Sequence, residues 1–265
     1  MDIKKVYIDT RFKTADSKSD SDFYVELPRA LNIPDKCVCY IDDIVIPVSW
    51  NTISERNRVL YLGVNVDGVI STRTITFDVG NYTGITFTTA FSTKVNAALE
   101  SESLALVVSY DLLNNKLQMV LNDNRAIVIG AAEIAILTNA EIDIAIPNSL
   151  NGVLMLSETA NLVVGVPFFT HLDLHTTRNL YLTSSSLAAY NTVSNFGPDT
   201  IIKKIPVRFN YNEMLFDSAE SGYDYLDVSK RSLRRIDFRL QDAFGNIINL
   251  NGNHWSFSLI FQLLD

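Results

Sequence analysis

Hydrophobic and polar residues alternate along most of the chain, which is the pattern of β-strands that bury one face. Two such stretches follow each other near the C-terminus. The first has an apolar face of Ile236, Phe238 and Leu240 and a polar face of Arg235, Asp237, Arg239 and Gln241. The second has an apolar face of Trp255, Phe257, Leu259 and Phe261 and a polar face of His254, Ser256, Ser258 and Gln262. Both are predicted to be strands of one β-rich fold.

Short apolar stretches separated by turn-forming residues also occur nearer the N-terminus. The stretch CVCYIDDIVIPV (residues 37–48) predicts a long strand, and Asp42-Asp43 interrupt its alternation, which indicates a bulge or bend. Strand-like stretches return after residue 156. Short strands with turn signals between them are typical of a β-sandwich or barrel.

Residues 59–124 have a different pattern. Two strands are expected around Asp67-Gly68, a dipeptide that suits a hairpin turn, and two more around residues 113–115. Between these hairpins, four large apolar residues recur at every fourth position: Phe87, Phe91, Val95 and Leu99. This spacing predicts one helix, with Thr86 capping its start. The region is therefore predicted to be a ββαββ segment and an inserted subdomain.

The composition is that of a folded protein whose main role is not to coat phosphates. Of 265 residues, 47% are hydrophobic and 20% charged, and the net charge is -8. No apolar stretch approaches the roughly 18 residues of a membrane helix, and the N-terminal segment lacks the apolar core of a signal peptide. We therefore expect synthesis without a signal peptide and no membrane insertion. Cys37 and Cys39 are expected to be small buried residues.

The segment THLDLHTT is the strongest hint of an enzyme. On a strand, His171, Asp173 and His175 would share one face, and imidazole and carboxylate groups are good ligands for iron or zinc. His254 is the candidate for a distant ligand. The polar outer face of an amphipathic strand explains the same pattern. A metal site of His171, Asp173 and His254 is therefore kept as an alternative, and no metal or cofactor is expected.

Two charged clusters each have a functional and a structural interpretation. The basic cluster consists of Lys230, Arg231, Arg234, Arg235 and Arg239. It could contact nucleic acid or the interior of a shell, or it could form a charged sheet face. The acidic cluster consists of Asp217, Glu220, Asp224 and Asp227, whose spacing matches no calcium loop. Phosphate-binding, dinucleotide-binding, zinc-finger and nucleophile motifs are missing from the sequence, which disfavours an enzyme.

A series of strand-and-turn segments covers nearly the whole chain. It begins with VYIDTRFKTADSKSDSDFYVELPRAL and CYIDDIVIPVSWNTI, and continues with GNYTGITFTTAFSTKVNAAL and VVSYDLLNNKL. It ends with HLDLHTTRNLYLTSSSLAAYNT, IIKKIPV and LRRIDFRLQDAFGNIINLNGNHWSFSLIF. Together, these segments resemble the minor capsid (penton) proteins of Maverick/Polinton elements, adintoviruses and related virophage-like viruses. Each segment consists of predicted strands and turns, and none is a catalytic signature.

The resemblance implies an antiparallel jelly-roll β-sandwich at the fivefold vertices of an icosahedral virion. It implies a homopentamer that assembles with a separate double-jelly-roll major capsid protein, and no catalytic residues. Residues 1–58 would then form an N-terminal arm and the first jelly-roll strands, residues 59–150 the ββαββ insertion, and residues 151–265 the remaining strands.

Seven aromatic residues crowd a weakly patterned region: Tyr181, Tyr190, Phe196, Tyr211, Phe216, Tyr223 and Tyr225. A shell protein can place such residues at contacts between copies, and a monomer would place them in its core. A receptor- or glycan-binding module, in which exposed aromatic residues line a groove, is a further alternative.

Overall fold

The computed structural model describes residues 3–138, 141–142, 148–189, 200–219 and 225–264. The chain forms two compact units, the first made of residues 1–50 and 177–265 and the second of residues 51–176. Strands are the main regular elements of both units, and the described residues contain a single α-helix. The prediction of a mainly β protein with one helix is confirmed. No helix within the described ranges is long and apolar enough to cross a membrane.

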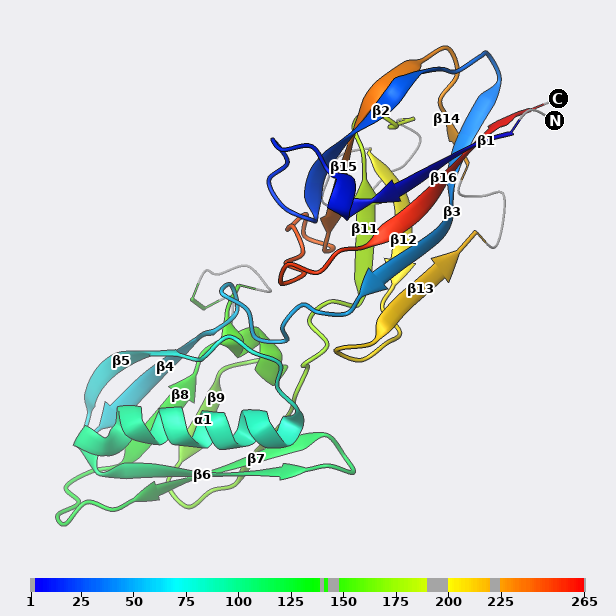
Figure 1. The fold of residues 1–265 in the computed structure, drawn as a ribbon. Coiled ribbons are helices and arrows are strands. Elements are labelled where there is room, and N and C mark those ends of the chain that lie inside the picture. The colour runs from blue at the N-terminus through cyan, green and yellow to red at the C-terminus, as the bar shows by residue number, and fades with distance from the viewer. Residues whose placement is uncertain (1–2, 139–140, 143–147, 190–199, 220–224, 265) are drawn as a thin grey trace. The chain divides into compact units, whose positions relative to one another are not determined.

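The first unit is an antiparallel β-sandwich of two sheets (Figure 1). One sheet has the order β1 (Ile3–Asp9), β16 (Ser256–Leu263), β3 (Cys37–Pro47) and β13 (Met214–Ser218), and the short β14 (Leu226–Asp227) also pairs with β3. The other sheet has the order β12 (Ile201–Pro206), β11 (Asn179–Thr183), β15 (Ser232–Gln241) and β2 (Asp22–Asn32). A short 3-10 helix, η1 (Thr10–Phe12), follows β1.

The two sheets bury one apolar core between them. The predicted apolar faces of the last two strands both point into it, and Cys37 and Cys39 are buried there as expected. At its centre the ring of Phe238 lies 4.9 Å from that of Phe257, and the Trp255 ring stacks on Phe257 at 5.0 Å. Period-two alternation therefore located the core of this unit.

The alternation fails at two places in this unit. On β16, Ser258 of the predicted polar face is buried, as is Ile260 on the same side, and β16 is a central strand between β1 and β3. On β15, Asp237 of the polar face is buried as well. The interruption predicted at Asp42-Asp43 is confirmed, since the pairing of β16 with β3 shifts register at this point.

The second unit contains two further antiparallel sheets and the helix. One sheet has the order β5 (Val69–Thr76), β4 (Val59–Val66), β8 (Ala132–Ile136) and β9 (Ala160–Val163). The other has the order β10 (Phe168–His171), β7 (Lys116–Asp123) and β6 (Leu104–Asp111). The helix α1 (Gly84–Leu99) and the 3-10 helices η2 (Glu100–Glu102) and η3 (Leu150–Leu154) complete the unit.

Helix α1 packs through the stripe that its spacing predicts. Phe87, Phe91, Val95 and Leu99 are all buried. The predicted cap was one turn too late, because the N-cap is Thr83, whose hydroxyl accepts a hydrogen bond from the backbone nitrogen of Thr86 at 3.2 Å. The Thr86 hydroxyl accepts one in return from the backbone nitrogen of Thr83 at 2.9 Å, so the two threonines form a capping box.

The second unit covers more of the sequence than the inserted segment expected at residues 59–150. On the N-terminal side, Ile53 is fully buried in its core and bridges to Gly80. On the C-terminal side, β9 pairs with β8 and β10 pairs with β7. Residues 151–176, which were assigned to the jelly roll, therefore complete the sheets of the second unit.

Candidate assembly surface

The first unit exposes apolar side chains at one edge of its β1–β16–β3–β13 sheet. On the edge strand β1, Val6 and Ile8 pack into the core, so the residues at odd-numbered positions of this strand face outward. Among these, Ile3 is 45% exposed and Tyr7 is 76% exposed. Large apolar side chains that stay this exposed at a sheet edge contribute little to the core of the monomer.

The opposite edge strand, β13, repeats this arrangement. Leu215 packs into the core, whereas Met214 and Phe216 point outward and Phe216 is 63% exposed. Phe216 lies opposite Val45 of β3, and Val45 lies opposite Ser256 of β16. Because cross-strand partners share one face, these side chains form a row across three strands.

A pair of tyrosines lies on the same face. The ring of Tyr40, on β3, lies 4.8 Å from that of Tyr225. Burial, together with the neighbouring Tyr225, raises the pKa of the Tyr40 phenol. We call this outer surface the apolar face, and it comprises Ile3, Tyr7, Tyr40, Val45, Met214, Phe216 and Tyr225.

The outer face of the other sheet has a different character, because it carries the basic cluster in ion pairs. Arg235 pairs with Asp16 and its guanidinium lies 4.2 Å from the centre of the Tyr24 ring. Arg234 lies 3.1 Å from Glu26, and Arg239 lies 3.4 Å from Asp22.

The remaining two cations of the cluster are also engaged. Lys230 lies 3.1 Å from Asp35, and its hydrogen bond is the main reason that the pKa of this carboxyl is lowered. Arg231 donates to the carbonyl oxygens of Ser186 at 3.0 Å and Ala188 at 2.7 Å. All five cations therefore have partners, which is the arrangement of a charged sheet face.

Asp237 lies opposite Tyr24 on the polar face that alternation assigns to it, but it is buried there. Its carboxylate accepts hydrogen bonds from the backbone nitrogens of Ser185 (3.0 Å) and Ser186 (2.8 Å) and from both serine hydroxyls (2.8 and 2.5 Å). Burial alone would raise the pKa of Asp237, but these hydrogen bonds outweigh it and hold the pKa below its ordinary value. The residue anchors the turn after β11.

The histidine pattern does not form the predicted shared face. Strand β10 ends at His171, which lies opposite Lys116, the first residue of β7. The backbone beyond His171 leaves the sheet, and the nitrogen of Asp173 donates to the carbonyl of Val153 at 2.8 Å. The expectation of one strand face for His171, Asp173 and His175 is therefore wrong.

The proposed distant ligand and this segment belong to different units. His254 belongs to the first unit, where its Nδ1 lies 3.2 Å from Oδ1 of Asp20, whereas His171 and Asp173 belong to the second. Within the described ranges, no group of three or more His, Cys, Asp and Glu side chains could hold a metal ion.

The acidic cluster is described only in part. Asp217 lies 3.2 Å from Nζ of the buried Lys203, and Asp227 accepts a hydrogen bond from the backbone nitrogen of Ser229 at 2.9 Å. Glu220 and Asp224 lie outside the described residues. The two described members therefore serve local contacts within the first unit.

The aromatic group is also described in part. Tyr190, Phe196 and Tyr223 lie outside the described residues. None of the other four is buried, and Tyr211, Phe216 and Tyr225 are exposed. Phe216 and Tyr225 belong to the apolar face. Sequence reasoning missed Tyr7 and Met214, although each alternates with a core residue.

The second unit has an apolar tip of its own. Val69, Ile70, Ile127, Val128 and Ile129 are each more than half exposed. Arg125 holds the two turns together, because its guanidinium lies 2.8 Å from Asp67 and donates to the carbonyl of Gly130 at 2.9 Å. Asp67 also accepts a hydrogen bond from the backbone nitrogen of Gly130 at 2.6 Å.

Comparison with known proteins identifies the fold. No protein-family model matches the sequence, and no curated protein matches it either. Among solved structures, the chain is similar to the mavirus penton protein, with a TM-score of 0.57 and 12% sequence identity over 100% of both chains. The predicted jelly-roll sandwich with one helix is confirmed: the chain has the mainly antiparallel β fold of a viral penton protein.

Proposed function

We propose that the chain is a structural capsid protein, the penton subunit at the fivefold vertices of an icosahedral virion. The likeness to the mavirus penton protein over the whole of both chains carries this proposal. It agrees with the resemblance of the sequence to penton proteins of Maverick/Polinton elements and adintoviruses. The activity is assembly, and no residue is assigned a catalytic role.

The proposed assembly is a ring of five copies. The apolar face supplies one side of a contact, since exposed Tyr7 and Phe216 are the kind of side chain that interfaces bury. In a cyclic ring each contact joins two different surfaces of neighbouring copies, and the ring closes by symmetry. A second, double-jelly-roll major capsid protein would surround each ring in the virion.

Nucleic-acid contact is proposed to be weak. Phosphate binding requires cations that are free to exchange their partners, and Arg234 and Arg235 already pair with Glu26 and Asp16. The net charge of -8 also opposes general attraction to nucleic acid.

Co-assembly tests the proposal. The chain would be expressed with the major capsid protein of the same genome, and the particles imaged by electron microscopy with fivefold averaging. The proposal expects density for five copies at each vertex, which is lost when this chain is omitted. Particles that contain the chain at another position, or that exclude it, would refute the vertex role.

A further inference from the structure

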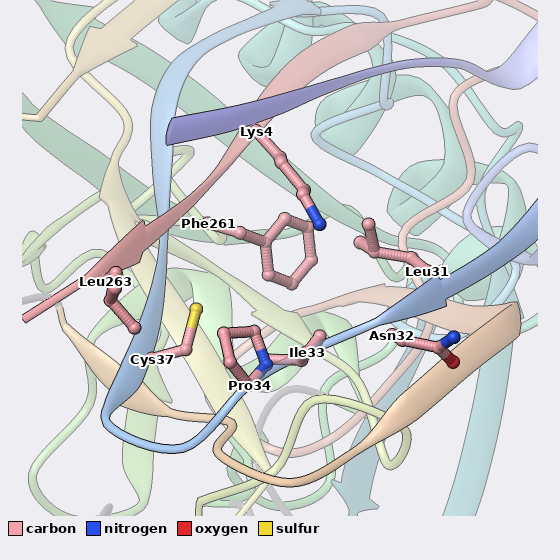
Figure 2. A pocket seen from close by; sticks show the side chains of 8 residues that line it. All are labelled: Lys4, Leu31, Asn32, Ile33, Pro34, Cys37, Phe261 and Leu263. Atoms are coloured by element: carbon pink, nitrogen blue, oxygen red, sulfur yellow. The ribbon is translucent and has the colours of Figure 1, made fainter. Parts of the chain in front are cut away.

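One end of the first unit carries a small apolar pocket (Figure 2). Six apolar side chains from β2, β3, β16 and the turn after β2 line it: Leu31, Ile33, Pro34, Cys37, Phe261 and Leu263. Its free interior is about 30 Å³, where a single water requires about 10–15 Å³ in the same measure. The pocket therefore has room for a group of a few atoms.

A lysine stands at the mouth of this pocket. Lys4 lies opposite Phe261 in the pairing of β1 with β16, and in Figure 2 its side chain extends over the ring of Phe261. It occupies the face of β1 that also carries Val6 and Ile8, the residues that pack into the core. An ammonium group is thus placed where alternation would put an apolar side chain.

The ammonium of Lys4 has no ion-pair partner among the described residues, whereas its neighbour Lys5 lies 3.5 Å from Asp42. Apolar walls lower the local dielectric constant and strengthen the attraction of such a group for an anion. Pocket and ammonium together fit a ligand that joins a small aliphatic group to a carboxylate.

We propose that this pocket binds the C-terminal residue of a peptide chain. The branched side chain of a C-terminal Leu, Ile or Val enters the pocket, and the terminal carboxylate pairs with the Lys4 ammonium. A single residue supplies both groups at the short separation that the site requires. Capture of a terminal carboxylate is a known mode of peptide recognition, and it does not depend on the proposed capsid role.

A competing account gives Lys4 a protective role. An inward-pointing charge on an edge strand discourages pairing with other chains, and β1 is an edge strand. That account predicts no ligand, so a binding measurement separates the two.

The test titrates the full chain with acetyl-Gly-Gly-Leu and with the same peptide as its C-terminal amide, followed by NMR chemical shifts. The acid is expected to bind about tenfold more tightly than the amide, which is the size of one charge-assisted contact. Lys4→Met should abolish this preference. Lys5→Met, one residue away on the opposite face of β1, is the matched control and should keep it.

Three results would overturn the proposal. The first is equal binding of acid and amide, and the second is no binding of the acid at millimolar concentration. The third is 4-methylpentanoate binding as tightly as the peptide, which would assign the pocket to small carboxylic acids. Thermal unfolding of both variants checks that the fold is retained.

Discussion

The carboxylate of Asp237 accepts four hydrogen bonds from Ser185 and Ser186 while it is only 7% exposed. An asparagine at this position would keep the volume but would place an amide donor against these donors. We expect Asp237→Asn to lower the free energy of unfolding by about 2 kcal/mol. Urea denaturation measures this, with Asp43→Asn, an exposed position on β3, as the control that should change little.

The same residue predicts how stability depends on pH. The pKa of Asp237 is lowered in the folded state, so its ionisation stabilises the fold above the unfolded-state pKa of about 3.9. This contribution is lost as the pH falls through the folded-state pKa. We expect the unfolding free energy to decline below about pH 4, and less steeply for Asp237→Asn than for the native chain. Parallel pH profiles of equal slope would contradict the assignment.

Residue pattern alone could not predict that Asp237 is buried. Alternation assigns it to the outer face of the sheet, where it lies, but Arg235 and Arg239 of the same face are exposed. The serines that bury Asp237 come from a turn about 50 residues earlier in the chain. Only the tertiary fold brings them together, and the same is true of the acids that pair with the basic cluster.

At the scale of elements, helix α1 depends on its capping box. Thr83→Ala removes the hydroxyl that accepts from the backbone nitrogen of Thr86 and leaves this donor without its partner. We expect a loss of about 1 kcal/mol in the unfolding free energy of the second unit. Thr93→Ala, on the exposed side of the same helix, should cost nothing, since alanine favours helices.

The ion pairs on β15 lead to a prediction about nucleic acid. Because Arg234 and Arg235 are already neutralised by Glu26 and Asp16, replacing both with alanine should change the affinity for duplex DNA less than about threefold. Fluorescence anisotropy at low salt measures this. A large loss of affinity, together with a steep salt dependence in the native chain, would show that the cluster binds phosphate.

Elements in which hydrophobic residues recur with a clear period could be predicted from the sequence. Elements without such a period could not. The stripe of α1 and the turn at Asp67-Gly68, which has φ of 54° and 83°, are local features. By contrast, η3 and the short strands β9 and β10 are specified by partners elsewhere in the chain, such as β7 for β10. This explains why the sequence did not predict that β10 ends at His171. The metal-site hypothesis had assumed a strand that continues beyond this residue.

At the scale of the whole molecule, the apolar face is the surface that we propose copies of the chain bury against one another. We expect the double variant Tyr7→Ser and Phe216→Ser to weaken association of copies by at least about tenfold, because the loss of even one interface aromatic residue that contributes about 2 kcal/mol has an effect of that size. Both side chains are exposed, so the unfolding free energy should be nearly unchanged. Dilution series in mass photometry measure the association.

A matched control for this variant lies in the second unit. Leu113 is 96% exposed at the tip of the β6–β7 hairpin, and Leu113→Ser removes an exposed apolar side chain that does not belong to the apolar face. It should leave association unchanged. If Leu113→Ser weakens association as much as the double variant does, the contact is nonspecific and the apolar face has no special role.

The mass of the purified chain in solution, read by multi-angle light scattering alone and with the major capsid protein, tests the central claim most directly. The account predicts a species of about 149 kDa, five times the chain mass of 29.7 kDa, in at least one of these samples. A mass of one chain that persists at high concentration and in the presence of the major capsid protein would contradict it.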